Sequence, residues 1–192
     1  EQSDVKVVAT SDIQAVHLAG NPIGKTGGSE EGGGVGGGVA YTDYNTDTSV
    51  RVGASTKISA DNLHLKADAY LFNVMIGISR GGADSFSVSG AGGIANIKTR
   101  TITQLDESVL VKTGQNLTLD AADDLLNVNV AGGIAKAKSV GVGLSFGTNI
   151  VDRQSRALIG NNAVPIGDGK ATPSSGVDTN TNAINLGYDH GL

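Results

Sequence analysis

The sequence predicts an all-β fold of the parallel β-helix (β-solenoid) class, and a repeated pattern is the main reason. Residues 116–130 resemble residues 62–76, which lie 54 positions earlier, so that Leu117 matches Leu63. A further shift of 58 positions brings Val5 to the same place in the pattern. A period of this size is typical of repeat architectures, in which stacked units share one continuous interior.

Each copy opens with aliphatic side chains at every second position, which is the pattern of a β-strand. In the second copy Leu63 and Leu65 occupy odd positions, whereas Phe72 and Val74 occupy even positions. We interpret this change of parity as a corner of the chain that keeps both sets on one apolar face. The corners are expected at residues 10–12, 68–69 and 122–124.

Glycine is the second observation, because the chain holds 29 glycines among 192 residues, about twice the usual share. Glycine is costly in a helix and useful in tight turns. We expect glycine-rich loops that project from one side of a three-repeat array. These loops are predicted at residues 20–38, 79–84 and 136–139.

The composition narrows the possible functions. The formal net charge of −5 disfavours binding to nucleic-acid phosphates. The sequence contains no run of 18 apolar residues, which is the length that a membrane-spanning helix needs, and its first residues show no signal pattern. Direct membrane insertion is therefore not expected. The absence of cysteine excludes disulfides and thiolate metal sites. Because the pattern is already under way at Val5, we interpret the chain as a piece of a longer protein.

The repeats define the expected domain organisation. The array is predicted over residues 4–163, with copies at 5–62, 63–116 and 117–163. Proline, glycine and serine then predict a linker, so residues 164–192 are expected to be a linker and the start of a following segment.

Stacking of the copies should place equal residues on top of one another at the strand spacing of about 4.8 Å. Asn73 would then lie over Asn127 and form an amide ladder. Because a unit of 54 residues is longer than one coil is expected to be, we expect two or three coils in each repeat. The three repeats would make roughly six to nine coils, or about 30–45 Å of rod. An antiparallel β-sandwich is the alternative fold, since short strands with glycine-rich turns also suit that class.

Two glycine motifs resemble nucleotide-binding sequences. Residues 19–26 fit a loose phosphate-loop pattern, but the glycines and glutamates that follow cannot form the helix that such a loop needs. Gly32, Gly34 and Gly37 satisfy the spacing G-x-G-x-x-G, as almost any glycine run does. We therefore predict no nucleotide or other cofactor site.

Histidines and aspartates are the remaining candidates for chemistry. His17 and His64 alternate with apolar residues, so both are expected to point outward, and His190 lies in the tail. Residues 43–47 and 123–124 offer carboxylate oxygens for calcium, although turn capping is the default interpretation of such residues. We predict no catalytic residue and no metal site, hence no enzyme, while calcium stays an open possibility.

The repeats resemble those of very large bacterial surface exoproteins. The likeness is carried by residues 117–121, 128–135, 140–146 and 156–160, and by the tail at 184–192. The family comprises filamentous-haemagglutinin-like adhesins, leukotoxin-like exoproteins and autotransporter passengers. The resemblance implies an extracellular or cell-surface β-helical stalk that mediates attachment, aggregation, or biofilm and filament formation.

Partners implied by that resemblance are glycans or proteins on host or neighbouring cells, or further copies of the chain. A polysaccharide lyase or epimerase on a β-helix is the alternative from another class, and it predicts carboxylates and basic residues in a cleft on one lateral face. A carbohydrate-binding module that uses the variable loops is the third possibility.

Overall fold

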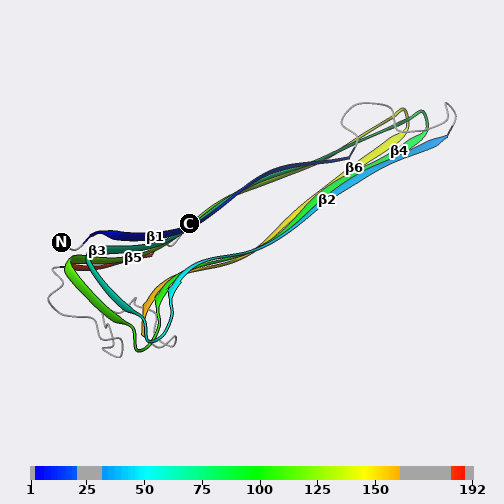
Figure 1. Ribbon diagram of the computed structural model, residues 1–192. Helices are drawn as coiled ribbons and strands as arrows, with labels where there is room; N and C mark the ends of the chain where they lie inside the picture. Colours follow the sequence, from blue (N-terminus) through cyan, green and yellow to red (C-terminus); the bar gives the residue numbers. More distant parts are fainter. Residues whose placement is uncertain (1–2, 21–31, 161–182, 189–192) are drawn as a thin grey trace.

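The protein consists almost entirely of β-strands in two sheets that run along a common long axis (Figure 1). The structure is a computed structural model that describes residues 3–20, 32–160 and 183–188. Sheet A contains, in spatial order, β1 (Val5–Gly20), β3 (Lys57–Ala83), β5 (Leu110–Ala137) and β7 (Ala183–Tyr188). Sheet B contains β2 (Gly33–Val52), β4 (Phe86–Leu105) and β6 (Val140–Ile159).

All strand pairs among the described residues are parallel, and their register follows the repeat. In sheet A, Val5 lies beside Leu63 and Leu63 beside Leu117. In sheet B, Phe86 lies beside Val140. The predicted stacking at offsets of 58 and 54 residues is thus confirmed in sheet A, whereas in sheet B Gly33 pairs with Phe86, 53 positions later. The alternative of an antiparallel sandwich is wrong. Parallel strands in two sheets are consistent with the predicted solenoid class.

Each repeat makes one winding of the chain, because it supplies one strand to sheet A and one to sheet B. The expectation of two or three coils per repeat is therefore wrong. A strand of 20 residues such as β4 is about 65 Å long, so two strands of this kind occupy the whole repeat. Three stacked strands span only about 10 Å, and the molecule is consequently long parallel to its strands (Figure 1).

One half of the molecule has a conventional apolar interior, and we call it the leucine-rich half. It combines the first parts of β3 and β5 with the last parts of β4 and β6. Leu63 and Leu65 are buried there against Leu117, Leu119 and Leu105. These are the aliphatic ladders that the repeat predicts, and they hold the windings together by removing apolar surface from water.

The predicted corners at residues 10–12, 68–69 and 122–124 are wrong, since all three lie within the continuous strands β1, β3 and β5. The odd-numbered side chains of β3 stay on the inner face as far as Ser79. Phe72 and Val74 therefore point to the outer face. The change of parity in the sequence marks a switch in which side of the sheet is apolar, and the chain itself does not turn.

In the other half, the glycine-rich half, small residues separate the two sheets. A Cβ atom added to Gly77 would lie 2.9 Å from the carbonyl oxygen of Gly92 in the facing sheet. The hydroxyl of Ser89 donates to the hydroxyl of Ser79 across the same gap, at 2.9 Å. With the backbones this close, large side chains have no space inside, and the apolar residues of this half remain outside.

The glycine-rich segments are largely strand, contrary to the predicted loops. Residues 33–38 belong to β2, and the connections that the structure describes at this end are only residues 84–85 and 138–139. Residues 21–31 and the predicted linker at 164–182 lie outside the described residues, as does His190. At the opposite end Ser55 and Ser108 adopt the left-handed region, with φ of 63° and 61°. The strand β7 adds to sheet A, with Ile184 beside Leu117.

Candidate functional site

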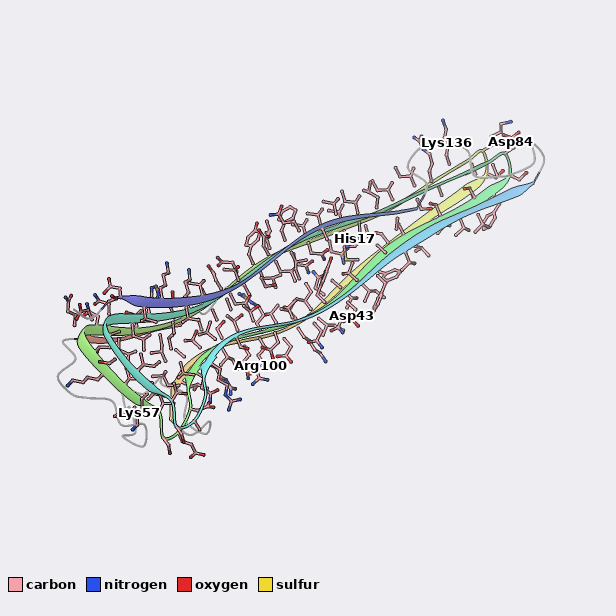
Figure 2. All side chains as sticks on the ribbon, viewed as in Figure 1. His17, Asp43, Lys57, Asp84, Arg100 and Lys136 are labelled. Atoms are coloured by element: carbon pink, nitrogen blue, oxygen red, sulfur yellow. The ribbon has the colours of Figure 1, made fainter. Side chains whose placement is uncertain are left out.

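A chain of polar contacts crosses the interior where the two halves meet. His17 Nε2 and Tyr44 Oη are 2.9 Å apart, and Tyr44 donates to Asn73 Oδ1 at 3.4 Å. Asn73 is fully buried and donates from Nδ2 to Asn127 Oδ1 at 2.8 Å. The predicted amide ladder is confirmed, but the outward position predicted for His17 is wrong, because His17 lies between the two sheets (Figure 2). Burial raises the pKa of the Tyr44 hydroxyl, which keeps its proton available for donation.

Replacing Asn73 with leucine should lower the free energy of unfolding by about 1–3 kcal/mol. The substitution leaves the side chains of Tyr44 and Asn127 without their partner in a buried place. Chemical denaturation monitored by circular dichroism measures the change. Asn62→Leu is the matched control, because Asn116 donates to Asn62 at 2.9 Å in an exposed ladder, where water can replace the bond. Equal losses for both variants would contradict the role of burial.

The most deeply buried charge among the described residues is the carboxylate of Asp123, on the inner face of β5. Its side chain is 1% exposed and lies 3.3 Å from the guanidinium of Arg153 on β6. Thr99 on β4 donates to the same carboxylate oxygen at 2.5 Å, and Arg153 also donates to the Asp123 carbonyl. The pair joins the two sheets in the third winding. Ala69 and Thr99 occupy the same places in the second winding.

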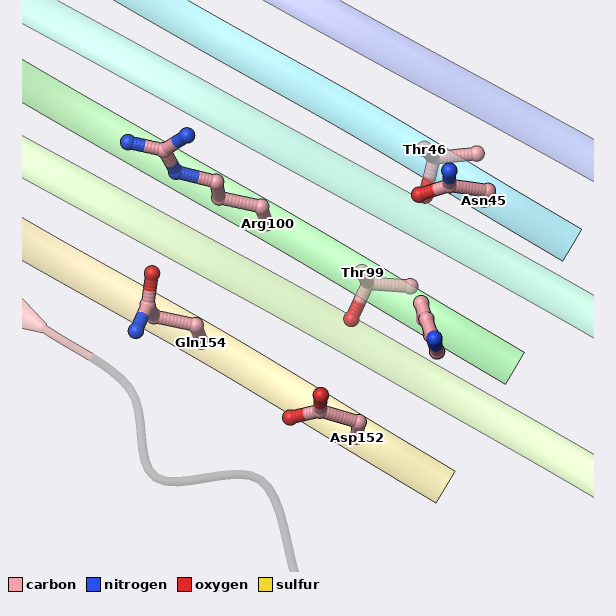
Figure 3. Close-up of a pocket in the computed structure, with 7 residues that line it drawn as sticks. Asn45, Thr46, Thr99, Arg100, Asp152 and Gln154 are labelled. Carbon is pink, nitrogen blue, oxygen red and sulfur yellow. The ribbon is translucent and has the colours of Figure 1, made fainter. Parts of the chain in front are cut away.

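A polar depression of about 150 Å³ lies on sheet B in the leucine-rich half (Figure 3). Its central residues are Lys98 and Arg100 on β4, which lie beside Asp152 and Gln154 on β6. Arg100 also lies 3.6 Å from Asp47 on β2. The remaining lining residues are Asn45, Thr46 and Thr99. The depression is smaller than the roughly 300–1,000 Å³ of typical ligand pockets, so it could hold a single sugar ring or a carboxylate.

The sequence motifs that resembled nucleotide sites do not gather into one. Gly34 and Gly37 lie within the strand β2, and no helix follows them in the described part of the chain. Residues 21–31, which include most of the phosphate-loop pattern, lie outside the described residues. His64 alternates with the buried Leu63 and Leu65 and lies on the outer face of β3.

The predicted calcium ligands are not brought together. Asp123 points inward to Arg153, whereas Asp124 follows it on the outer face. Asp43 accepts a hydrogen bond from Asn96 at 3.1 Å, and Asp47 pairs with Arg100. Among the described residues no cluster of three or more acidic or histidine side chains could hold a metal ion.

Because three of these aspartates already contact Asn96, Arg100 and Arg153, we expect calcium and EDTA to leave the melting temperature unchanged. A folded-state site would raise it, because a ligand at a hundred times its Kd stabilises by about 2.7 kcal/mol. Differential scanning calorimetry with calcium, with EDTA and with magnesium as the control measures this. A rise in melting temperature that is specific to calcium would overturn the expectation. The variant Asp43→Asn would then test whether Asp43 and Asp47 on sheet B bind the ion.

These features define the chain as a repeat protein of two parallel β-sheets with polar networks between and upon them. No family model, curated protein or solved structure matches the chain. The described ranges contain no helix with the length and apolar character that crossing a membrane requires.

Two polar features were not predicted from the sequence. Asp152 lies more than 50 positions from Lys98 and Arg100 in the chain, and the register of sheet B brings the three into one depression. The pairing of Asp123 with Arg153 requires the two sheets to face one another. The available signal was a break in the repeat, because an aspartate replaces Ala69 and an arginine replaces Thr99 one period later.

Proposed function

We propose that this chain is a structural and adhesive stalk segment of a bacterial cell-surface or secreted adhesin, built as a β-solenoid. The main observation in support is that each repeat pairs in parallel and in register with the next in both sheets. Each winding offers the next one the same kind of strand edge, with matching residues at matching places. Further repeats can therefore be added without a change of interior, which is how solenoids extend.

The contacts between windings suit a stalk segment. Main-chain hydrogen bonds run along strands of 16 to 28 residues, from β1 to β6. The ladders of Leu63 on Leu117 and of Asn73 on Asn127 add apolar and amide contacts at matching places. The resemblance of the repeats to bacterial adhesins supports a place outside the cell. Glycans or proteins of host or neighbouring cells are the partners that this function requires.

Display of the chain on a non-adherent bacterium tests the proposal. We expect faster settling and greater attachment to host cells than with a glycine and serine chain of the same length. A second control carries Leu65→Asp, which places a charge in the interior and should unfold the displayed segment. Equal attachment by the chain and the flexible control would refute the adhesive function.

Carbohydrate binding is the second candidate function, and the depression on sheet B is the observation that favours it. Lys98 and Arg100 could donate to a sugar carboxylate, while Asp152 and Gln154 could receive hydroxyl hydrogens. We expect acidic oligosaccharides to bind, and Arg100→Ala to weaken binding about tenfold. Titration calorimetry with uronic-acid trisaccharides measures this, with Lys6→Ala on sheet A as the control.

A lyase or epimerase at the same depression would change the sugar, and not merely bind it. Incubation with uronic-acid polymers, followed by absorbance for unsaturated products and by NMR for epimers, separates the two. If the wild type converts the polymer and Arg100→Ala does not, the enzymatic proposal replaces the binding proposal.

A further inference from the structure

The outer faces of the glycine-rich half are apolar on both sides of the molecule. On sheet A, ladders of equal residues run across the strands, such as Val16 beside Val74 and Val74 beside Val128. Leu18, Ile76 and Val130 form the next ladder. On sheet B the most exposed members are Val35, Val39, Tyr41, Val140, Leu144 and Phe146, at 50–72% exposure.

This surface is large for a protein that stays alone. If a fully exposed side chain of this size presents roughly 150–200 Å², the six residues on sheet B expose on the order of 600 Å². That value reaches the upper end of about 300–600 Å² for the largest apolar patch on a typical monomer. Less exposed neighbours such as Val88 and Ile94 bring it towards the roughly 800 Å² that each partner contributes to a standard interface.

The apolar residues cannot be hidden by local rearrangement. A one-residue shift of register would turn them inward, but the positions that face inward are filled by glycine and serine. A Cβ at Gly34 would lie 2.8 Å from the carbonyl oxygen of Gly82, and one at Gly81 would lie 2.7 Å from Ser87 Oγ. Any larger side chain would force the sheets apart, so no shift of register within the described part of the chain can cover these faces.

We propose that the partner is a second copy of this chain, docked sheet face on sheet face through the glycine-rich half. Flat sheets with aligned ladders pack on one another at about 10 Å, and this chain offers such a face on each side. Within the described residues, none of the outward side chains of β2, β4 and β6 in this half is charged, so stacking buries no charge there. A copy bound to one face leaves the other face open for a third copy.

Two further observations favour a second copy over a lipid surface. The strands β2 and β6 form the two edges of sheet B in the described part of the chain. Their free backbone groups would be unsatisfied in hydrocarbon, whereas they stay in water or pair with strands in a protein assembly. In the leucine-rich half some of the outer charges pair within one copy, namely Lys66 with Asp68 at 2.9 Å and Arg100 with Asp47 at 3.6 Å.

This inference deepens the stalk function and rests on it, since lateral docking requires rods that present the same faces along their length. Sedimentation velocity from low micromolar to near-millimolar concentration is the test. We expect the wild type to form larger species as concentration rises. The variant Val16→Glu with Val35→Glu, one change on each outer face, should weaken this association by about a hundredfold or more.

The control variant, Thr10→Glu with Ser49→Glu, lies on the same strands and the same outer faces in the leucine-rich half. It adds the same charge and should associate like the wild type, and circular dichroism checks that all variants fold. Equal association of both variants, or a wild type that remains an elongated monomer, would overturn the docking while leaving the stalk intact. Flotation of a monomeric wild type with phosphatidylcholine vesicles would assign the faces to lipid instead.

Discussion

Arg153→Thr should lower the free energy of unfolding by about 3–5 kcal/mol, because it leaves the Asp123 carboxylate buried without its counter-charge. Asp123 is 1% exposed, and Thr99 would be its only remaining side-chain partner among the contacts described. Oδ1 of Asp123 already lacks a hydrogen bond within the described residues. Urea denaturation of the wild type and the variant measures the loss.

The chain supplies its own control for this prediction. The double variant Asp123→Ala with Arg153→Thr installs in the third winding the residues that the second winding has as Ala69 and Thr99. Removing both charges should restore stability to within about 1 kcal/mol of the wild type or raise it, since replaced buried ion pairs often prove neutral. A double variant as unstable as Arg153→Thr would show that the arginine acts through packing instead.

Gly77→Val should cost about 3 kcal/mol or more, at the upper end of the range for overpacked interiors. Its Cβ would lie 2.9 Å from the carbonyl oxygen of Gly92, and the contact is backbone to backbone across two sheets. Neither side can move without breaking a ladder of main-chain hydrogen bonds. Thermal unfolding followed by circular dichroism measures the loss.

Gly82→Val on the same strand is the matched control, because an added Cβ there meets nothing within 4 Å. Valine suits a strand better than glycine, so this variant should be neutral or stabilised by up to about 1 kcal/mol. Similar destabilisation at both positions would mean that β3 loses stability through a general effect of side-chain size, and that the close approach of the sheets is not the cause.

The register of the strands could be predicted from the sequence, because it depends only on matching residues. Leu63 and Leu117 must lie side by side to share an interior, and the recurrence of the pattern after 54 residues predicts this pairing. The same reasoning predicted the bond between Asn73 and Asn127. The number of windings could not be obtained in this way, since an interval of 54 residues fits one long winding or several short ones.

The prediction of corners is wrong for a related reason. Alternation of apolar residues identifies an apolar side of a strand, but it does not say whether that side faces the interior. In β3 the apolar side faces inward at Leu65 and outward at Val74. Apolar residues normally belong inside, so the switch predicts a bend. The close approach of Gly77 to Gly92, which limits the interior beyond Met75 to small residues, joins positions 15 residues apart on two different sheets.

The sequence alone determined that this is a parallel all-β repeat protein and which residues stack on which, because both follow from residues that recur at a constant interval. Only the tertiary structure decided that the sheets approach closely in one half, that His17 lies inside, and that Lys98, Arg100 and Asp152 share a depression. The depression depends on which side chains meet on the outer face of sheet B, whereas the first two features depend on the distance between the two sheets. That distance is set by side chains from separate strands meeting across a gap, and no single stretch of sequence contains it.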